Sequence, residues 1–278
     1  MTLEPGLYVA ATPIGNLKDV TYRVVETLAA ADRILCEDTR QTAKLCAAYQ
    51  IKTPRTAYNE HNAEKTQPEI IAALQAGAVI CLVSDAGTPL ISDPGFRLVR
   101  AAREAGVKVI PLPGPSAAIA ALSASGAPTE KFLFAGFPPA KAEARLAFLK
   151  TLAAVEATLV FYEGPSRLGD SLEAMAAAFG DRRAIVAREL TKLYEEFDAG
   201  TLPDLAAKYS AAAPKGEIVV LVFPPDAPEE ATPAEIDAFI VAALVAMSVK
   251  DAAAAAADAL GIAKKSAYER ALALRGGK

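Results

Sequence analysis

Short apolar runs alternate with helical segments along the first 112 residues of the chain. The run at residues 78–84, AVICLVS, is almost entirely apolar, which is typical of a strand buried on both faces of a parallel sheet. Other strands are predicted at residues 6–12, 33–36 and 107–112, and helices at residues 21–31, 37–49, 68–75 and 96–105. Because such strands pair in parallel through right-handed crossovers, the pattern predicts an α/β domain.

Glycine and proline interrupt this alternation at residues 125–141, so we expect a first domain at residues 1–124. Alternation resumes in residues 125–225, which predicts a second α/β domain. Its expected strands are residues 158–162, 184–188 and 217–223, and its expected helices are residues 143–155, 167–179 and 204–209. Residues 226–278 are expected to hold the end of a proline-rich linker and helices at residues 234–246, 249–260 and 264–274.

Composition excludes several classes of protein. The chain has 278 residues, three cysteines without a CxxC spacing and a single histidine, which argues against a disulfide scaffold and disfavours metal chemistry. No apolar run approaches the ~20 residues of a membrane helix. The first ten residues lack the basic start and long apolar stretch of a secretory signal. We therefore expect a cytoplasmic enzyme.

The net charge of −4 is unevenly distributed. Residues 226–248 carry five acidic side chains and no basic one, whereas residues 249–278 carry six basic and three acidic ones. The helices around Gly261 resemble a helix-turn-helix in outline, and Lys264, Lys265 and Arg270 lie in its second helix. These side chains are candidate partners for nucleic-acid phosphates, although a dimerising or capping pair of helices explains the pattern equally well.

Three loops rich in glycine, proline or small residues directly follow predicted strands: ATPIGN at residues 11–16, VSDAGTPLISDPG at residues 83–95 and PLPGPSAAIAA at residues 111–121. In the third loop, Ser116 is placed to cap a helix of small residues. Ligands of open α/β sheets bind beyond the carboxyl ends of the strands, so these loops predict a ligand site. None of them matches GxGxxG or a P-loop, and a nicotinamide dinucleotide is only weakly supported.

Two polar clusters, CEDTRQT at residues 36–42 and NEHN at residues 59–62, supply candidate reactive groups. Asp38, Glu60 and His61 are candidate proton acceptors, and Arg40 is a candidate partner for a phosphate. Simpler interpretations stay open, because a lone histidine is more often structural and most arginines are solvated surface charges.

In their order along the chain, these motifs together resemble the tetrapyrrole methylase superfamily, and its ribosomal branch in particular. The motifs are LYVAATPIGNLKD, CEDTRQT, NEHN, SDAGTPLISDPG, PGPSA, FYEGPSRL, RELTK and KGE, from Leu7 to Glu217. The resemblance implies two α/β domains with S-adenosylmethionine in the cleft between them, and a homodimer. It also implies 2′-O-methylation of a decoding-region cytidine in 16S rRNA, with naked rRNA or the 30S ribosomal subunit as the substrate.

The resemblance further implies which residues contact the cofactor. The family's Gly-Asp-Pro motif falls on Gly87, Thr88 and Pro89, where threonine replaces aspartate as in the ribosomal branch. The other implied cofactor positions are Pro13, Ala86, Ile91, Ser116, Ala117, Tyr162, Glu163, Leu190, Lys215, Gly216 and Glu217. Small and apolar side chains suit an adenine, and a cationic sulfonium is disfavoured beside lysine or arginine.

Two alternatives remain open. A methyltransferase for a tetrapyrrole or a protein side chain is disfavoured by Thr88 and by the basic C-terminal segment. A non-catalytic, ribosome-binding assembly factor is expected to have its cofactor pocket filled by side chains. Gly87, Gly95 and Gly114 instead predict an open pocket.

Overall fold

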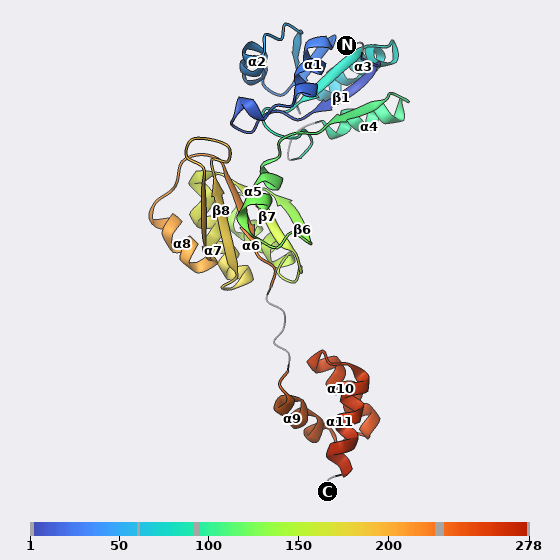
Figure 1. Ribbon diagram of the computed structural model, residues 1–278, viewed down its shortest axis with the longest axis vertical. Coiled ribbons are helices and arrows are strands. Elements are labelled where there is room, and N and C mark those ends of the chain that lie inside the picture. Colours follow the sequence, from blue (N-terminus) through green and yellow to red (C-terminus); the bar gives the residue numbers. More distant parts are fainter. Residues whose placement is uncertain (1–2, 60–61, 92–94, 226–230, 277–278) are drawn as a thin grey trace. The chain divides into compact units, whose positions relative to one another are not determined.

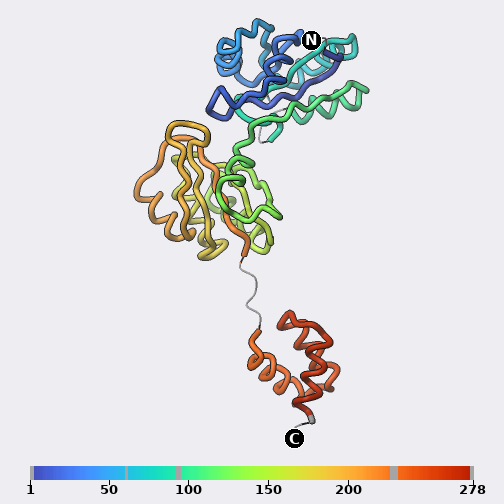
Figure 2. The backbone as a smooth tube through the Cα atoms, viewed as in Figure 1, coloured from blue at the N-terminus to red at the C-terminus, as the bar shows by residue number. Residues whose placement is uncertain are grey.

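The computed structural model describes residues 3–59, 62–91, 95–225 and 231–276. The chain divides into two compact units, Met1–Pro225 and Asp226–Lys278. Among the described residues, the first unit contains two five-stranded sheets and the second contains three helices. Figure 1 shows these elements as a ribbon, and Figure 2 follows the same backbone as a tube. None of the helices in the described ranges is both long and apolar enough to cross a membrane.

The first sheet is fully parallel and has the strand order β3-β2-β4-β1-β5. Its strands are β1 (Gly6–Ala10), β2 (Arg33–Cys36), β3 (Arg55–Ala57), β4 (Val79–Val83) and β5 (Val109–Leu112). Helices α1 (Tyr22–Ala30) and α2 (Thr39–Ala48) pack on one face, and helices α3 (Ala63–Gln75) and α4 (Phe96–Glu104) on the other. The α/β class expected from the alternating pattern is therefore confirmed.

Strand β4 is the central strand of this sheet. All five of its residues are buried, because helices cover both faces and neighbouring strands pair with both edges. Strands β1, β4 and β5 are adjacent and parallel, so their carboxyl ends lie at one edge of the sheet. The loops that follow these three strands therefore start side by side, which is the arrangement that binds ligands in open α/β sheets.

The second sheet is mixed and has the order β6-β7-β10-β8-β9, with only β6 and β7 parallel. Its strands are β6 (Phe132–Gly136), β7 (Thr158–Glu163), β8 (Arg183–Arg188), β9 (Glu196–Thr201) and β10 (Ile218–Val222). Helices α6 (Ala142–Thr151), α7 (Leu168–Phe179) and α8 (Leu202–Ala211) cover one face. Helix α5 (Ala117–Ser125) and Ile14, from the loop after β1, cover the other face.

Several elements differ from the expectation. Strands β3, β6 and β9 were not predicted. β9, with the sequence EFDAGT, lies at a sheet edge and lacks an apolar alternation that would reveal it. Helix α3 begins at Ala63 and tolerates Pro68 inside it, and α6 ends at Thr151 rather than at residue 155. The domain boundary at residue 125 stays a prediction; helix α5 precedes it and packs on the second sheet.

The C-terminal unit consists of α9 (Pro233–Ala243), α10 (Val249–Leu260) and α11 (Lys264–Gly276). Thr232 and Glu235 form a capping box at the start of α9, and Gly261 ends α10 in the left-handed conformation. The core is built mainly from alanines, including Ala253, Ala256 and Ala267, together with Ile240. Small side chains allow the helices to approach closely, so this short segment still has a buried core.

Candidate functional site

A cavity of about 340 Å³ lies between the loops of the first sheet and the second sheet. The loops after β1, β4 and β5 supply one wall, and the second sheet and its loops supply the other. This first cavity is lined by Ile14, Ala86, Gly87, Thr88, Ile91, Ser116, Ala117, Phe137, Tyr162, Glu163, Gly164, Pro165, Leu190, Gly216, Glu217, Ile218 and Val219. Its volume is in the range of small-molecule sites.

Backbone and hydroxyl groups hold the three loops together. Thr12 and Gly87 exchange two backbone hydrogen bonds of 2.9 and 3.0 Å, which joins the loops after β1 and β4. The Thr88 hydroxyl donates to the carbonyl of Pro115 at 3.0 Å, which joins the loops after β4 and β5. These bonds fix the wall of the first cavity before any ligand arrives, which is the advantage of a preorganised site.

Gly87 is needed for this wall. Its φ is +79°, a conformation that side chains rarely adopt, and an added Cβ would lie 3.3 Å from Cγ2 of Ile14. Ser116 lies at the N-cap position of α5, but its side chain makes no capping hydrogen bond. The predicted N-cap position of Ser116 is therefore confirmed, but its hydroxyl does not cap the helix; the backbone N–H of Ala118 instead donates to the Tyr162 hydroxyl at 3.2 Å.

Aromatic rings form the side of the first cavity that belongs to the second sheet. Tyr162 has edge-to-face contacts with Phe134 and Phe137, at centroid distances of 4.8 and 5.5 Å. Phe137 is 54% exposed and borders the cavity. A flat apolar group could therefore lie against these rings and against Leu190.

The charged groups around the first cavity are all acidic. Neither lysine nor arginine lines it among the described residues, whereas Glu163 and Glu217 do. The Glu163 carboxylate is buried and accepts hydrogen bonds from Ser171 and from the backbone of Gly164, and it is ion-paired with Arg167. The Glu217 side chain is 73% exposed and is the more accessible of the two. This cavity suits an apolar ligand that carries positive charge.

A second cavity, of about 390 Å³, adjoins the first. Ile14, Ala86 and Glu217 line both cavities. The remaining lining residues of the second cavity are Thr12, Pro13, Gly15, Leu17, Gln41, Thr42, Lys44, Leu45, Ser84, Asp85 and Lys192. Unlike the first cavity, the second one is bordered by two lysines as well as by the carboxylates of Asp85 and Glu217, so it contains cationic groups that can meet the negative charge of a ligand.

Lys192 lines the second cavity and contacts Glu217, which lines both cavities. Its ammonium group contacts Oε1 of Glu189 at 2.9 Å and Oε2 of Glu217 at 3.0 Å. Burial alone would lower the pKa of Lys192, but the hydrogen bonds to the two carboxylates raise it above its usual value. The hydrogen bond from Lys192 and the backbone N–H of Glu217 lower the pKa of Glu189. Lys192 and Glu189 are therefore both charged at neutral pH.

The backbone around Lys192 is unusual. Glu189 and Thr191 have φ values of +51° and +68° although neither is glycine. Gly15 and Gly216 leave room for this segment, because an added Cβ would lie 2.6 Å from the Lys192 side chain and 2.4 Å from the Glu189 side chain, respectively. Strained conformations of this kind cluster at functional sites.

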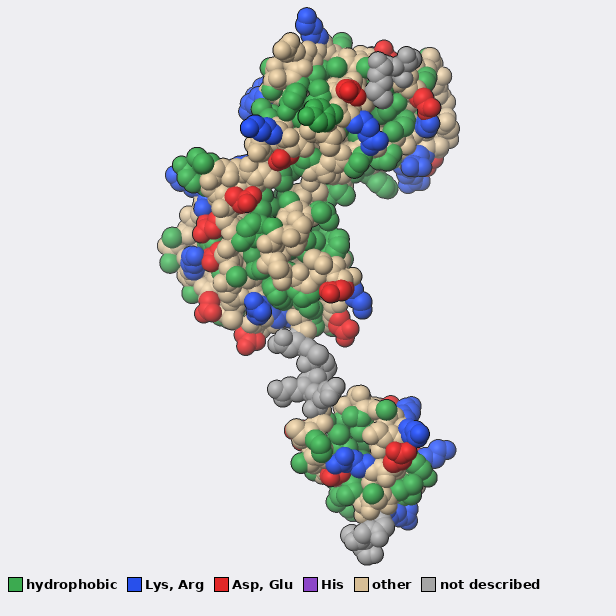
Figure 3. Space-filling view, viewed as in Figure 1, with side chains coloured by type: hydrophobic (Ala, Val, Ile, Leu, Met, Phe, Trp, Pro, Cys, Tyr) green, Lys and Arg blue, Asp and Glu red, His purple; other side chains and the backbone are tan. Residues whose placement is uncertain are grey.

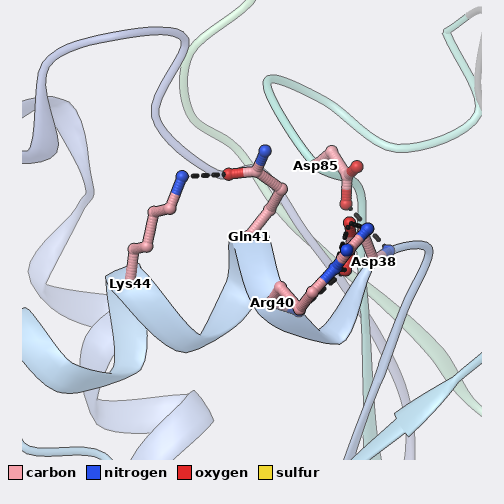
Figure 4. A network of polar contacts seen from close by, with 5 residues as sticks. All are labelled: Asp38, Arg40, Gln41, Lys44 and Asp85. Atoms are coloured by element: carbon pink, nitrogen blue, oxygen red, sulfur yellow. Dashed lines mark hydrogen bonds and ion pairs between the residues drawn. The ribbon is translucent and has the colours of Figure 1, made fainter.

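Asp38 and Arg40 lie near the second cavity without lining it. Asp38 caps α2 by accepting the N–H of Arg40 at 2.8 Å, and its carboxylate is ion-paired with the Arg40 guanidinium at 2.8 Å. These hydrogen bonds lower the pKa of Asp38. Figure 4 shows this pair beside Asp85, whose Oδ1 accepts the backbone N–H of Asp38 at 3.0 Å. Glu60 and His61 lie outside the described residues.

The other candidate residues are distributed as follows. Eleven of the fourteen implied cofactor residues line the first cavity. Pro13 lines the second cavity, and Pro89 and Lys215 line neither. In the C-terminal unit, Lys264 and Lys265 are exposed, and Lys264 has only a long, exposed ion pair with Asp258 at 3.9 Å. Arg270 has a closer ion pair with Asp237 of α9. Figure 3 shows basic side chains along one edge of this unit.

Sequence reasoning did not single out Gln41, Lys44, Asp85 or Lys192 as site residues. Gln41 and Lys44 are three residues apart on α2, a spacing that places both on one helix face. For Lys44 that spacing was the only signal, whereas Gln41 also lies in the CEDTRQT cluster. Lys192 lies in the RELTK motif, but its charge alone did not distinguish it from a residue of a solvated face.

Comparison with known families gives two matches. Residues 6–206 match the family described as Tetrapyrrole (Corrin/Porphyrin) Methylases. Residues 230–275 match the RsmI C-terminal HTH domain.

Curated relatives cover nearly the whole chain. The Ribosomal RNA small subunit methyltransferase I of Mesorhizobium japonicum is 53% identical over 275 residues, covering 98% of this chain and 93% of the relative. The protein of the same name from Haemophilus influenzae is 44% identical over 274 residues, covering 96% of each chain.

Solved structures share the fold at lower identity. A diphthine synthase superposes with a TM-score of 0.61 at 15% identity, covering 78% of this chain and 89% of that one. A cobalt precorrin-4 methyltransferase superposes with a TM-score of 0.60 at 17% identity, covering 78% and 94%. At these identities the superpositions show the fold alone.

Proposed function

Because the chain belongs to the tetrapyrrole methylase family and is similar along nearly its whole length to small-subunit rRNA methyltransferases, we propose that it methylates 16S rRNA. The methyl donor is S-adenosylmethionine, and the acceptor is the ribose 2′-oxygen of a decoding-region cytidine. The observation that carries the proposal is the adjacent pair of cavities: the charged residues described in the first lining are only acidic, and the second lining has two lysines beside two carboxylates.

The first cavity fits the methyl donor. Its volume and its apolar lining suit an adenosyl group, and Phe137, Tyr162 and Leu190 supply surfaces for the adenine. A cationic sulfonium is favoured beside Glu217 and meets no lysine or arginine among the described lining residues. The bound donor supplies an electrophilic methyl group.

The protein's part in the reaction begins with positioning. The acceptor oxygen has to lie in line with the bond that breaks, and fixing two substrates in that geometry can supply about 7–11 kcal/mol of the barrier. The bonds that join Thr12 to Gly87 and Thr88 to Pro115 hold the cavity wall rigid. Rigid walls keep the donor in one orientation while the acceptor enters from the second cavity.

Glu217 is the proposed acceptor of the 2′-hydroxyl proton. Its carboxylate borders both cavities, and Lys192 holds its Oε2 at 3.0 Å. Asp38 fits this role less well, because it lines neither cavity. Glu60 and His61 stay candidates from sequence alone.

The C-terminal unit is proposed to add affinity for RNA. Lys264 and Lys265 are exposed at the start of α11, where they can meet phosphates. Arg270 is less available, because it is ion-paired with Asp237 and donates to the carbonyl of Pro233 at 3.1 Å. We therefore assign the phosphate contacts to the two lysines and a structural role to Arg270. A homodimer and a cytoplasmic location belong to the same proposal.

The direct test is tritium transfer from labelled S-adenosylmethionine to 30S subunits from a strain that lacks the corresponding enzyme, followed by nuclease mapping. Label on the ribose of one decoding-region cytidine is the expected result. Calorimetric binding of S-adenosylmethionine without transfer would keep the methyltransferase and reject this acceptor. Absence of both binding and transfer would favour a non-catalytic assembly factor.

A further inference from the structure

We infer that the second cavity binds the acceptor nucleotide of a single-stranded RNA segment, and that Lys44 and Gln41 of α2 bind its phosphate. The inference rests on the proposed function and extends it to Lys44, which lies outside the sequence motifs, and to Gln41 of the CEDTRQT cluster. It follows from three features of the cavity, namely its position, the distribution of its charges and its size.

The position of the cavity fits an acceptor site. Ile14, Ala86 and Glu217 line both cavities, so a ligand in the second cavity contacts the same three residues as the methyl donor in the first. Asp85 and Ser84 extend the second cavity along the end of β4. A sugar held at the shared wall would therefore lie between the methyl donor and the Glu217 carboxylate.

The two lysines of this cavity are not equivalent. Lys192 already has two carboxylate partners, Glu189 and Glu217, so its charge is neutralised by the protein. Lys44 is exposed and donates to the neutral amide oxygen of Gln41 at 2.7 Å. Within the ranges that the structure describes, Lys44 has no ion pair with a carboxylate. Lys44 is therefore the cation that this cavity keeps available for an anion.

Arg40 differs from Lys44 although both lie on α2. The Arg40 guanidinium is ion-paired with Asp38, and it points along the helix end toward Asp85 rather than toward Gln41 (Figure 4). Gln41 and Lys44 share one helix face and line the cavity together. The Gln41 amide nitrogen can donate to a second phosphate oxygen, while the ammonium group of Lys44 contacts the first.

The size of the cavity indicates one extruded nucleotide rather than a duplex. About 390 Å³ is enough for a ribonucleotide but not for a paired helix. Enzymes that modify a nucleotide commonly act on single strands or rotate the target out of its stack. The acceptor segment is therefore expected to be unpaired when it binds.

The test measures the affinity of the full-length protein for 30S subunits, and its methyl transfer to them, over a range of salt concentrations. Lys44→Met should weaken 30S binding about tenfold and flatten the log–log salt dependence by about 0.7, the value for one phosphate contact on a single strand. Lys44→Arg should restore both. The matched control is Lys52→Met, which removes an exposed lysine that lines neither cavity.

Each outcome decides between the two proposals. S-adenosylmethionine affinity, measured by calorimetry, should be the same in all four proteins. If the wild type transfers methyl groups while Lys44→Met keeps the wild-type affinity and salt slope, the phosphate site at Lys44 is wrong and the proposed function stands. If the wild type transfers no label to 30S subunits, the proposed function fails and the RNA site fails with it.

Discussion

The two cavities adjoin each other and differ in charge. The first has no basic side chain among its described lining residues, and the second has Lys44 and Lys192. They share Glu217, whose carboxylate is bound to Lys192 at the boundary. The difference lies in the cationic groups: the first cavity suits the proposed cationic donor, whereas Lys44 gives the second cavity a cation for the proposed anionic acceptor. The proposed chemistry takes place where the two environments meet.

Removal of the shared carboxylate should have the largest effect. Glu217→Gln keeps the size of the side chain but removes the proposed proton acceptor, so methyl transfer should fall by about 100-fold or more. S-adenosylmethionine affinity, measured by calorimetry, should fall much less, by about fivefold, because the cavity wall is retained and only the attraction of an exposed carboxylate for the sulfonium, about 1 kcal/mol, is lost. Glu143→Gln on the exposed part of α6 is the control. Wild-type turnover in Glu217→Gln would show that the shared carboxylate takes no part in the reaction.

Placing a cation in the first cavity should abolish the charge difference. Ile91 is 42% exposed and lines that cavity, so Ile91→Lys should be tolerated by the fold. A positive charge several ångströms from the sulfonium costs about 1–4 kcal/mol, which predicts at least fivefold weaker binding of S-adenosylmethionine. S-adenosylhomocysteine, whose sulfur is neutral, should lose less affinity. Ile91→Met controls for the change of shape, and equal losses for both ligands would contradict the electrostatic explanation.

The two exposed lysines of the C-terminal unit should also attract the phosphates of the RNA. Replacing Lys264 and Lys265 together by methionine should weaken 30S binding about tenfold and flatten its salt dependence. Truncation after Pro225 should weaken it at least as much. Neither change should alter S-adenosylmethionine binding, because both cavities are built from residues before that point. Unchanged affinity for 30S subunits in the truncated protein would leave the second cavity as the sole RNA contact.

The smallest expected effect is a loss of stability when Glu189, a partner of Lys192 beside the two cavities, is replaced by glutamine. The pKa of Glu189 is lowered by the hydrogen bond from Lys192 and by the Glu217 N–H. Its contribution to stability is therefore present above its unfolded pKa of about 4.3 and is lost as pH falls through the lower folded value. Glu189→Gln should cost about 1–2 kcal/mol of unfolding free energy at pH 7. Denaturant unfolding should show this difference narrowing below pH 4; a constant difference would contradict the ionic role.

The first cavity was largely predictable and the second was not. Gly87, Thr88, Ser116 and Ala117 lie in loops that directly follow strands, so local sequence already places them at one edge of a parallel sheet. Gln41, Lys44 and Lys192 come from a helix and from a loop nearly 150 residues further along the chain. No local pattern relates such distant segments.

Ion pairs in the folded protein also decide which charged side chains are available to a ligand. Asp38, Arg40 and Arg270 have residue types that suit catalysis or phosphate binding. In the folded protein, Arg40 is ion-paired with Asp38, and Arg270 is ion-paired with Asp237. A side chain's availability depends on which neighbour reaches it in the folded state, and the residue type alone does not reveal that neighbour.

The amino-acid sequence alone determined the α/β class, the ligand-binding loops and the family, because strand–loop–helix order is a local property that survives in the linear pattern. The tertiary structure decided the charge difference between the cavities, the isolation of Lys44 as a free cation among the described residues and the position of Glu217 at their boundary. These properties arise where the loop after β1 packs on the second sheet and α2 faces Lys192, since charges interact through distance in space rather than distance along the chain.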